Sequence, residues 1–163
     1  IDEGRLVPVT PVEGLITYHD PCYLGRHNKI YTPPREIIGS VPGLRSEEMH
    51  RHKERGFCCG AGGARMWMEE RIGKRINDER VDEALSLNPD IVSTACPFCL
   101  VMLTDSVNAK KAAAADGPTT DTPAKQTLQV VDVAQLLLDS VKTPPDPTGR
   151  TESENTPEPE PVE

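Results

Sequence analysis

The sequence has no long apolar run. No stretch approaches the ~20 consecutive apolar residues that a membrane-spanning helix needs, and no secretory signal segment opens the chain. An initiating methionine is also missing, because the chain begins at Ile1. We therefore expect a fragment of a longer protein. The fragment has no membrane span of its own, and its origin leaves room for a membrane anchor upstream.

The sequence also has no excess of basic residues. Its 163 residues carry 18 Lys and Arg against 26 Asp and Glu, a formal net charge of −8. Residues 143–163 contain six acidic side chains and one arginine, so they hold −5 of this charge and the rest of the chain holds −3. Nucleic-acid binding needs a concentrated basic face. We therefore expect no nucleic-acid partner.

The C-terminal segment, residues 143–163, offers little that a folded core could bury. Six prolines accompany its six acidic residues. A segment of low hydrophobicity and high charge cannot gain enough from burial to become ordered. We expect a disordered, acidic, Pro-rich tail. Residues 1–14 then lead in from the missing upstream part, and one metal-binding domain occupies residues 15–142, with a flexible stretch at 108–126.

Strands alternate with helices along the expected domain. Strands are expected at 14–19, 44–49, 90–94 and 128–131, and helices at 35–40, 64–87, 96–107 and 133–141. The longest helix is expected because Met68, Ile72 and Ile76 recur at four-residue steps. Asp132 is placed to cap the last helix, whose leucine run 136–138 is expected to face the sheet. The alternation predicts an α/β fold, a small mostly parallel sheet flanked by helices.

All five cysteines belong to one pattern. Cys22 is followed after 35 residues by the adjacent pair Cys58 and Cys59, and after a further 36 residues by Cys96, with Cys99 three positions on. Thiolates are soft ligands that select zinc, copper(I) or iron–sulfur clusters. Ligands of parallel sheets bind beyond the carboxyl ends of the strands. Because two expected strands end just before Cys22 and Cys96, we expect the thiols to converge at one edge of the sheet.

Four kinds of chemistry compete for these cysteines. A disulfide framework is disfavoured by their odd number and by the absence of a secretion signal. A structural zinc ion needs four ligands, and the side chains of Cys58 and Cys59 diverge, so one cysteine is left unused. Thiol–disulfide exchange at Cys96 and Cys99, at the start of a helix, ignores the other three. An iron–sulfur cluster is favoured, because neighbouring thiolates can bind different irons.

Several residues beside the cysteines are candidates for supporting the metal. Gly60, Gly62 and Gly63 let the backbone approach closely, with N–H groups directed at sulfur. Pro97 starts a helix whose positive end favours an anionic cluster. His19 is a candidate zinc ligand or hydrogen-bond donor, although a buried, hydrogen-bonded histidine is the commoner case.

Two arginines, Arg26 and Arg65, are placed to offset the negative charge of a cluster.

Three runs of the sequence resemble one family. They are HDPCYLGR at 19–26, FCCGAGG at 57–63 and ACPFC at 95–99. Together, over 15–107, they are similar to the cysteine-rich CCG domain of heterodisulfide reductases and of the iron–sulfur components of glycolate, lactate and glycerol-3-phosphate oxidation systems. The resemblance implies a [4Fe-4S] cluster, in some members a non-cubane one, and in other members zinc. The ligands it implies are Cys22, Cys58, Cys59, Cys96 and Cys99.

Residues 66–70 most resemble a membrane-anchored bacterial iron–sulfur reductase. That group takes electrons from an electron-transfer flavoprotein and passes them to a quinone. The resemblance therefore implies a redox protein partner, an oxidoreductase function shared with the remainder of the parent chain, and a place in the cytoplasm at the inner face of the plasma membrane. Many members carry the motif twice. This chain carries it once, so we expect the C-terminal copy, inactive when isolated.

Overall fold

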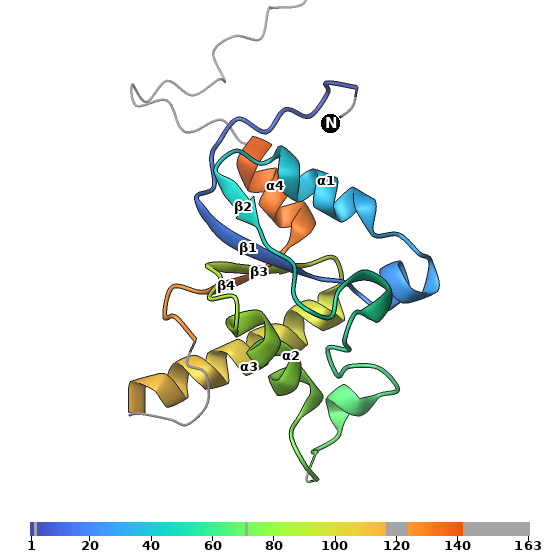
Figure 1. Ribbon diagram of the computed structural model, residues 1–163, viewed down its shortest axis with the longest axis vertical. Coiled ribbons are helices and arrows are strands. Elements are labelled where there is room, and N and C mark those ends of the chain that lie inside the picture. The colour runs from blue at the N-terminus through green and yellow to red at the C-terminus, as the bar shows by residue number, and fades with distance from the viewer. Residues whose placement is uncertain (2, 71, 117–123, 142–163) are drawn as a thin grey trace, which may run out of the picture.

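Four parallel strands form the centre of the molecule. The computed structural model describes residues 1, 3–70, 72–116 and 124–141 (Figure 1). The strands are β1 (Gly14–His19), β2 (Leu44–Ser46), β3 (Ile91–Thr94) and β4 (Gln129–Asp132), and they pair in the order β2-β1-β3-β4. All three pairings are parallel. The predicted α/β class and the predicted bounds of β1 are confirmed.

Helices cover both faces of the sheet. They are α1 (Thr32–Ser40), α2 (Ile76–Leu85), α3 (Pro97–Asp116) and α4 (Val133–Val141). In Figure 1, α1 and α4 lie on one side of the strands, and α2 and α3 lie on the other. Three short helical turns, at Tyr23–His27, Lys53–Arg55 and Arg65–Trp67, occur in the loops between these elements.

Each face of the sheet has its own apolar core. Ile16 of β1 pairs with Ile91 of β3, and both pack with Leu136 on the side of α1 and α4. The next pair along, Thr17 and Val92, faces the opposite way, and Val92 packs with residues of α2 and α3. Side chains alternate along a strand with a period of two. His19, two residues beyond Thr17, therefore projects from β1 toward α2.

The connections leave the two central strands in opposite directions. From β1 the chain passes through α1 to β2 at one edge, and from β3 it passes through α3 to β4 at the other edge. Adjacent parallel strands with diverging connections form a topological switch point, and ligands bind beyond the carboxyl ends of such strands. Cys22 lies three residues after β1, and Cys96 lies two residues after β3. The topology therefore brings two parts of the cysteine pattern to the position where α/β folds bind ligands.

The expected helix over 64–87 is wrong in its first half. Ala64 and Gly73 have positive φ angles of 62° and 72°, and such residues interrupt a right-handed helix. The chain makes only a short turn at Arg65–Trp67 before α2 begins at Ile76. The backbone N–H of Ile76 donates to Oε2 of Glu70 at 3.1 Å. This bond satisfies a backbone N–H group at the start of α2, and the spacing of apolar residues gives no sign of it.

Other boundaries also differ from the expected ones. The third helix extends to Asp116, so residues 108–116 of the expected flexible stretch are helical. The predicted cap is confirmed, because Oδ1 of Asp132 accepts the N–H of Ala134 at 2.8 Å. Of the leucine run in α4, Leu136 is buried while Leu138 is 48 % exposed, so the run does not face the sheet as a unit. The expected tail at 143–163 lies outside the described residues.

None of the helices in the described part of the chain is both long enough and apolar enough to cross a membrane.

Candidate metal centre

Two buried thiols and a histidine meet at the switch point. The sulfur atoms of Cys59 and Cys99 and a ring nitrogen of His19 all lie within 4.8 Å of one another. His19 ends β1, Cys59 belongs to the loop that precedes α2, and Cys99 lies in the first turn of α3. All three side chains are buried. Among the described residues, this is the group whose geometry would suit a metal ion.

Cys58 joins this group through its neighbour. Its Sγ accepts the backbone N–H of Gly60 at 3.2 Å. The hydrogen bond with the Cys59 thiol, together with burial, raises the pKa of Cys58 well above its usual range. At Cys59 the bond with Cys58 lowers the pKa, but the bond with Cys99 and burial raise it, giving about 11. The structure therefore brings three of the five predicted ligands into one row, with Cys58 adjacent to Cys59 in the chain and Cys59 near Cys99 in space.

The remaining two cysteines lie at the margin of this row. Cys96 is half-buried and packs against the small cluster of Cys59, Cys99 and Met102, directly before α3. Cys22 is exposed, and its carbonyl accepts the N–H of His27 at 3.0 Å within a short helical turn. Cys96 is therefore close to the row, whereas Cys22 lies beyond the end of β1 without a described contact to the other thiols.

Asp20 connects the loops that carry Cys22 and Cys58. Its carboxylate accepts hydrogen bonds from both terminal nitrogens of Arg35, at 2.8 and 2.9 Å, and from the backbone N–H of Lys53, at 2.7 Å. Burial alone would raise the pKa of Asp20, but Arg35 and the Lys53 amide hold it below its usual range. Sequence reasoning missed this role. The available signal was an acidic residue directly after a strand and two positions before a cysteine.

Arg26 makes a second connection between the same loops. Its guanidinium donates a hydrogen bond to the carbonyl of Gly56, two residues before Cys58. The predicted role of Arg26, offsetting cluster charge, stays a prediction, but the structure shows that the side chain holds the turn after Cys22 against the segment before Cys58.

The three predicted glycines have different surroundings. Gly60 has a φ of +88°, and a Cβ at this position would lie 3.2 Å from Cβ of Ile76 and 3.4 Å from Cε of Met102. Around Gly62 and Gly63, a Cβ would meet no described atom within 4 Å. Gly60 is therefore required by both conformation and packing where the cysteine loop meets α2 and α3. The metal-supporting roles of Gly62 and Gly63 stay predictions, as does that of Pro97, which is exposed at the start of α3.

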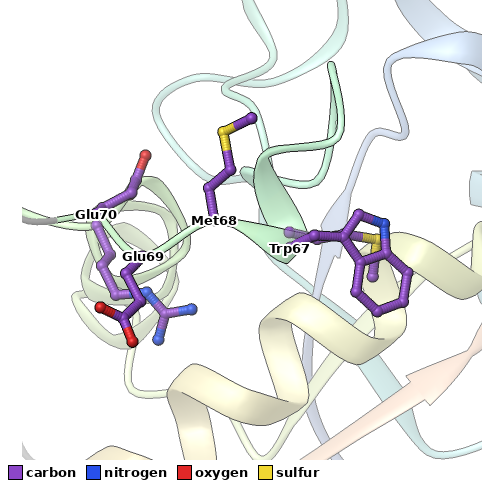
Figure 2. Close-up of a pocket in the computed structure, with 6 residues that line it drawn as sticks. Trp67, Met68, Glu69 and Glu70 are labelled. Carbon is purple, nitrogen blue, oxygen red and sulfur yellow. The ribbon is translucent and has the colours of Figure 1, made fainter.

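Arg65 pairs with an acidic neighbour, Glu70, rather than with a cysteine in the described contacts. The segment that follows lines a shallow pocket formed by Met66, Trp67, Met68, Glu69, Glu70 and Arg75. Figure 2 shows Met68 and Glu69 on opposite sides of this segment. Trp67 is 81 % exposed. Because the described partner of Arg65 is Glu70, the role of Arg65 in offsetting cluster charge stays a prediction.

His19 is held by Arg80, a residue of α2 that the sequence analysis did not identify. The Nε–H of Arg80 donates to Nδ1 of His19 at 3.0 Å, and both side chains are buried. Burial and the positive charge of Arg80 lower the pKa of His19 to about 3, against an opposing effect of Asp20. Because the guanidinium of Arg80 donates to Nδ1, that nitrogen carries no proton, so the ring is neutral. The histidine is buried and hydrogen-bonded, as the commoner of the predicted alternatives has it.

The residues at this site fit an iron–sulfur group. Thiolates are the usual ligands of such clusters, and here three thiols are gathered at the start of a 20-residue helix, whose positive end favours an anion. One terminal nitrogen of Arg80, Nη2, is buried without a hydrogen-bond partner among the described residues. Arg80 contacts His19 of the site, and a buried cation with an unsatisfied donor is compatible with a negatively charged group nearby.

Comparisons with known proteins find a cysteine-rich domain family and iron–sulfur oxidoreductases. A family model described as a cysteine-rich domain, CCG, matches residues 16–104. The chain is 45 % identical over 141 residues to a probable iron-sulfur-binding oxidoreductase, FadF, of Bacillus subtilis (strain 168), covering 86 % of this chain and 18 % of the relative. It is 42 % identical over 144 residues to the EtfAB:quinone oxidoreductase of Syntrophomonas wolfei subsp. wolfei, covering 84 % of this chain and 18 % of that protein.

A third relative comes from an archaeon. It is a component of the dihydromethanophenazine:CoB--CoM heterodisulfide reductase of Methanosarcina barkeri, 44 % identical over 101 residues, which cover 62 % of this chain and 25 % of that protein. The chain thus spans about a quarter or less of the length of these three relatives. No solved structure matches it. Because the family model covers more than half of the sequence and includes all five cysteines, the chain belongs to the CCG cysteine-rich domain family.

Proposed function

We propose that this chain is an iron–sulfur electron-transfer domain whose five cysteines hold a [4Fe-4S] cluster. The observation that carries the proposal is that the sulfur atoms of Cys59 and Cys99 lie within 4.8 Å of each other in one buried cluster, with Cys58 directly beside Cys59 in the chain. One tetrahedral ion has little use for two neighbouring thiolates. A cluster presents several irons a few ångströms apart and can use both. The iron–sulfur name of the Bacillus relative supports the same cofactor.

When bound, such a cluster accepts and releases single electrons. The chain would supply the thiolates and a fixed position for them. The ends of β1 and β3 set the distance between the segments, Asp20 and Arg26 join the loops of Cys22 and Cys58, and the first turn of α3 presents Cys99. Cys22, as the exposed ligand, would complete the site from the solvent side.

The complete reaction belongs to a longer protein. By analogy with the Syntrophomonas relative, named as an EtfAB:quinone oxidoreductase, the proposed electron donor is an electron-transfer flavoprotein and the acceptor a quinone. A disulfide acceptor corresponds to the Methanosarcina relative. We place the parent protein at the cytoplasmic face of the plasma membrane, on the strength of the sequence resemblance alone. The isolated chain should then bind the cofactor without turning over substrate.

Metal analysis tests the proposal directly. The chain is purified without oxygen, supplied with iron and sulfide, and analysed for iron, sulfide and zinc, with absorption and electron paramagnetic resonance spectra. We expect a brown protein with about four irons and four sulfides per chain, the content of one [4Fe-4S] cluster. A colourless protein that retains one zinc and rejects iron would show a structural zinc site. A protein free of metal, with alkylatable Cys96 and Cys99, would favour thiol exchange.

Single Cys→Ser variants sharpen the distinction. If both neighbours bind iron, Cys58→Ser and Cys59→Ser should each reduce the iron content by at least about half, because serine is a much poorer ligand for iron in clusters. Ser46→Ala, at an exposed position of β2, is the control and should keep the full content. A Cys58→Ser variant with the full metal content would contradict the use of both neighbours.

A further inference from the structure

A buried arginine connects α2 to the end of β1, where His19 lies near Cys59 and Cys99. Arg80 is fully buried, and its Nε donates to Nδ1 of His19 at 3.0 Å. Its Nη1 donates to the carbonyl of Arg51 at 2.9 Å and to Oε2 of Glu83 at 3.0 Å. Nη2 is the unsatisfied donor described above. Three of the five N–H groups of this guanidinium therefore have a defined partner, and the two on Nη2 have none among the described residues.

The bond from Arg80 determines which nitrogen of His19 carries the proton. A guanidinium only donates hydrogen bonds and stays protonated in proteins. Nδ1 of His19 must therefore present its lone pair to Arg80. A neutral imidazole has one N–H group, so the proton lies on Nε2.

This arrangement is the reverse of the one found at metal-bound histidines. A histidine ligand uses the lone pair of one nitrogen and donates the N–H of the other to a carboxylate, carbonyl or water. Here the partner of Nδ1 is an obligate donor, and Nε2 has no free lone pair. His19 lies within 4.8 Å of the sulfur atoms of Cys59 and Cys99, yet both of its nitrogens are unsuited to bind a metal. Its remaining N–H is suited to donate to sulfur.

We propose that Arg80 fixes His19 as an N–H donor to the ligand sulfur of Cys59 or Cys99, and that this pair raises the reduction potential of the bound cluster. The inference rests on the proposed iron–sulfur function. Reduction adds one electron and leaves the cluster more negative. Hydrogen bonds to the sulfurs and a buried positive charge stabilise that reduced form, and hydrogen bonding to sulfur is an established means of tuning cluster potentials. Arg80 acts through His19 and is a positioning residue.

Contacts around Arg80 keep it in this position. The carbonyl of Arg51 accepts from Arg80, while its guanidinium pairs with Glu83 at 2.8 Å and with Glu79 at 3.1 Å. The same guanidinium lies 3.8 Å from the ring centre of Phe57, the residue before Cys58. The network therefore links α2 to the cysteine loop. The positive charge of Arg51 is paired within it, with Glu83 and Glu79. The only described bond from Arg80 to the metal site passes through His19.

The tautomer can be tested without iron. Nitrogen-15 NMR of the wild-type chain, metal-free and zinc-loaded, distinguishes a protonated ring nitrogen from an unprotonated one. We expect His19 to show a protonated Nε2 and an unprotonated Nδ1 in both forms. A Nε2 that loses its proton or shows metal contact when zinc is added would overturn the inference, because His19 would then be a ligand. This measurement needs no variant, so it stays decisive even if substitutions at the buried site prevent folding.

The potential is tested in the iron-loaded chain with matched variants. His19→Met removes the donor with a side chain of similar size, and His19→Gln retains an N–H donor. In redox titrations followed by electron paramagnetic resonance, we expect His19→Met to keep its iron and to show about a tenfold lower ratio of reduced to oxidised cluster at a fixed potential, which equals about 59 mV for one electron. His19→Gln should lie nearer the wild type, and Arg80→Lys should resemble His19→Met.

The possible failures can be told apart. Loss of iron in His19→Met, with a changed cluster spectrum, would identify His19 as a ligand and reject the donor role. Retained iron with an unchanged potential would reject the inference and leave the proposed function standing. A wild-type chain that takes up no iron would reject both.

Discussion

At the scale of single residues, the side chains that support the cysteines come from distant parts of the sequence. Thiolate chemistry and spacing select all five cysteines from the sequence. Arg80 and Glu83 lie in a part of α2 that is rich in charged residues, which are usually exposed to solvent, yet Arg80 is fully buried. Its partner His19 lies 61 positions away. Only the packing of α2 against the end of β1 brings the two together, and periodicity along one segment carries no information on such a pair.

Glu83 provides a prediction at this scale. Its carboxylate accepts the backbone N–H and the guanidinium of Arg51, and a bond from Arg80. Burial would raise the pKa of Glu83, but these partners hold it below its usual value. Glu83→Gln should lower the free energy of unfolding at pH 7 by about 2 kcal/mol, the typical contribution of hydrogen bonds to a charged group.

The pH dependence of this effect has a defined sign. A carboxyl with a depressed folded-state pKa contributes its full stability above the unfolded value of about 4.3, and loses it as the pH falls through the lower folded value. The difference between wild type and Glu83→Gln, measured by chemical denaturation from pH 7 to 3.5, should therefore shrink below about pH 4. Both proteins share the same thiols, so acid effects on the metal site cancel. Glu36→Gln, on the exposed side of α1, is the control. A difference independent of pH would contradict the assignment.

At the scale of elements, strands were predicted better than the segment between Cys59 and α2. The bounds of β1 follow from a short β-branched run. The segment 64–75 was expected to be helical because Met68 and Ile72 share a four-residue spacing, but these side chains are 60 % and 96 % exposed. Spacing shows which residues would share a helix face, but it does not show whether a core is present to cover that face. The positive φ angles of Ala64 and Gly73 decide the outcome locally.

The junction of the cysteine loop with α2 and α3 depends on one glycine. Gly60→Ala should lower the free energy of unfolding by about 2 kcal/mol, from the cost of a left-handed backbone and from overpacking against Ile76 and Met102. It should also reduce the iron content. Gly62→Ala is the matched control, since a Cβ there would meet no described atom within 4 Å, and its effect should stay within about 0.5 kcal/mol. Equal effects in chemical denaturation would show that flexibility of the loop, rather than packing at Gly60, is what matters.

At the scale of the whole molecule, the fold and the site are built on separate contacts. The two main cores contain none of the cysteines, whereas a third, smaller cluster contains Cys59 and Cys99 with Met102. The parallel sheet could be predicted from the alternation of elements, and the location of the site from the ends of β1 and β3. The exact set of converging thiols could not, because the position of Cys22 depends on the loops that Asp20 and Arg26 hold.

This separation predicts a graded response to metal removal. Hydrogen exchange is compared in the metal-loaded chain and after chelation. We expect amides in 56–75 and in the first turn of α3 to lose protection by at least about tenfold, because metal binding energy there stabilises the local fold. Amides of β1, β3 and α4 should change by less than about twofold, because their cores hold no cysteine. Collapse of protection throughout the sheet would instead show that the metal supports the whole domain, as in small zinc-dependent folds. Unchanged exchange at 56–75 would place the metal outside the cysteine loop.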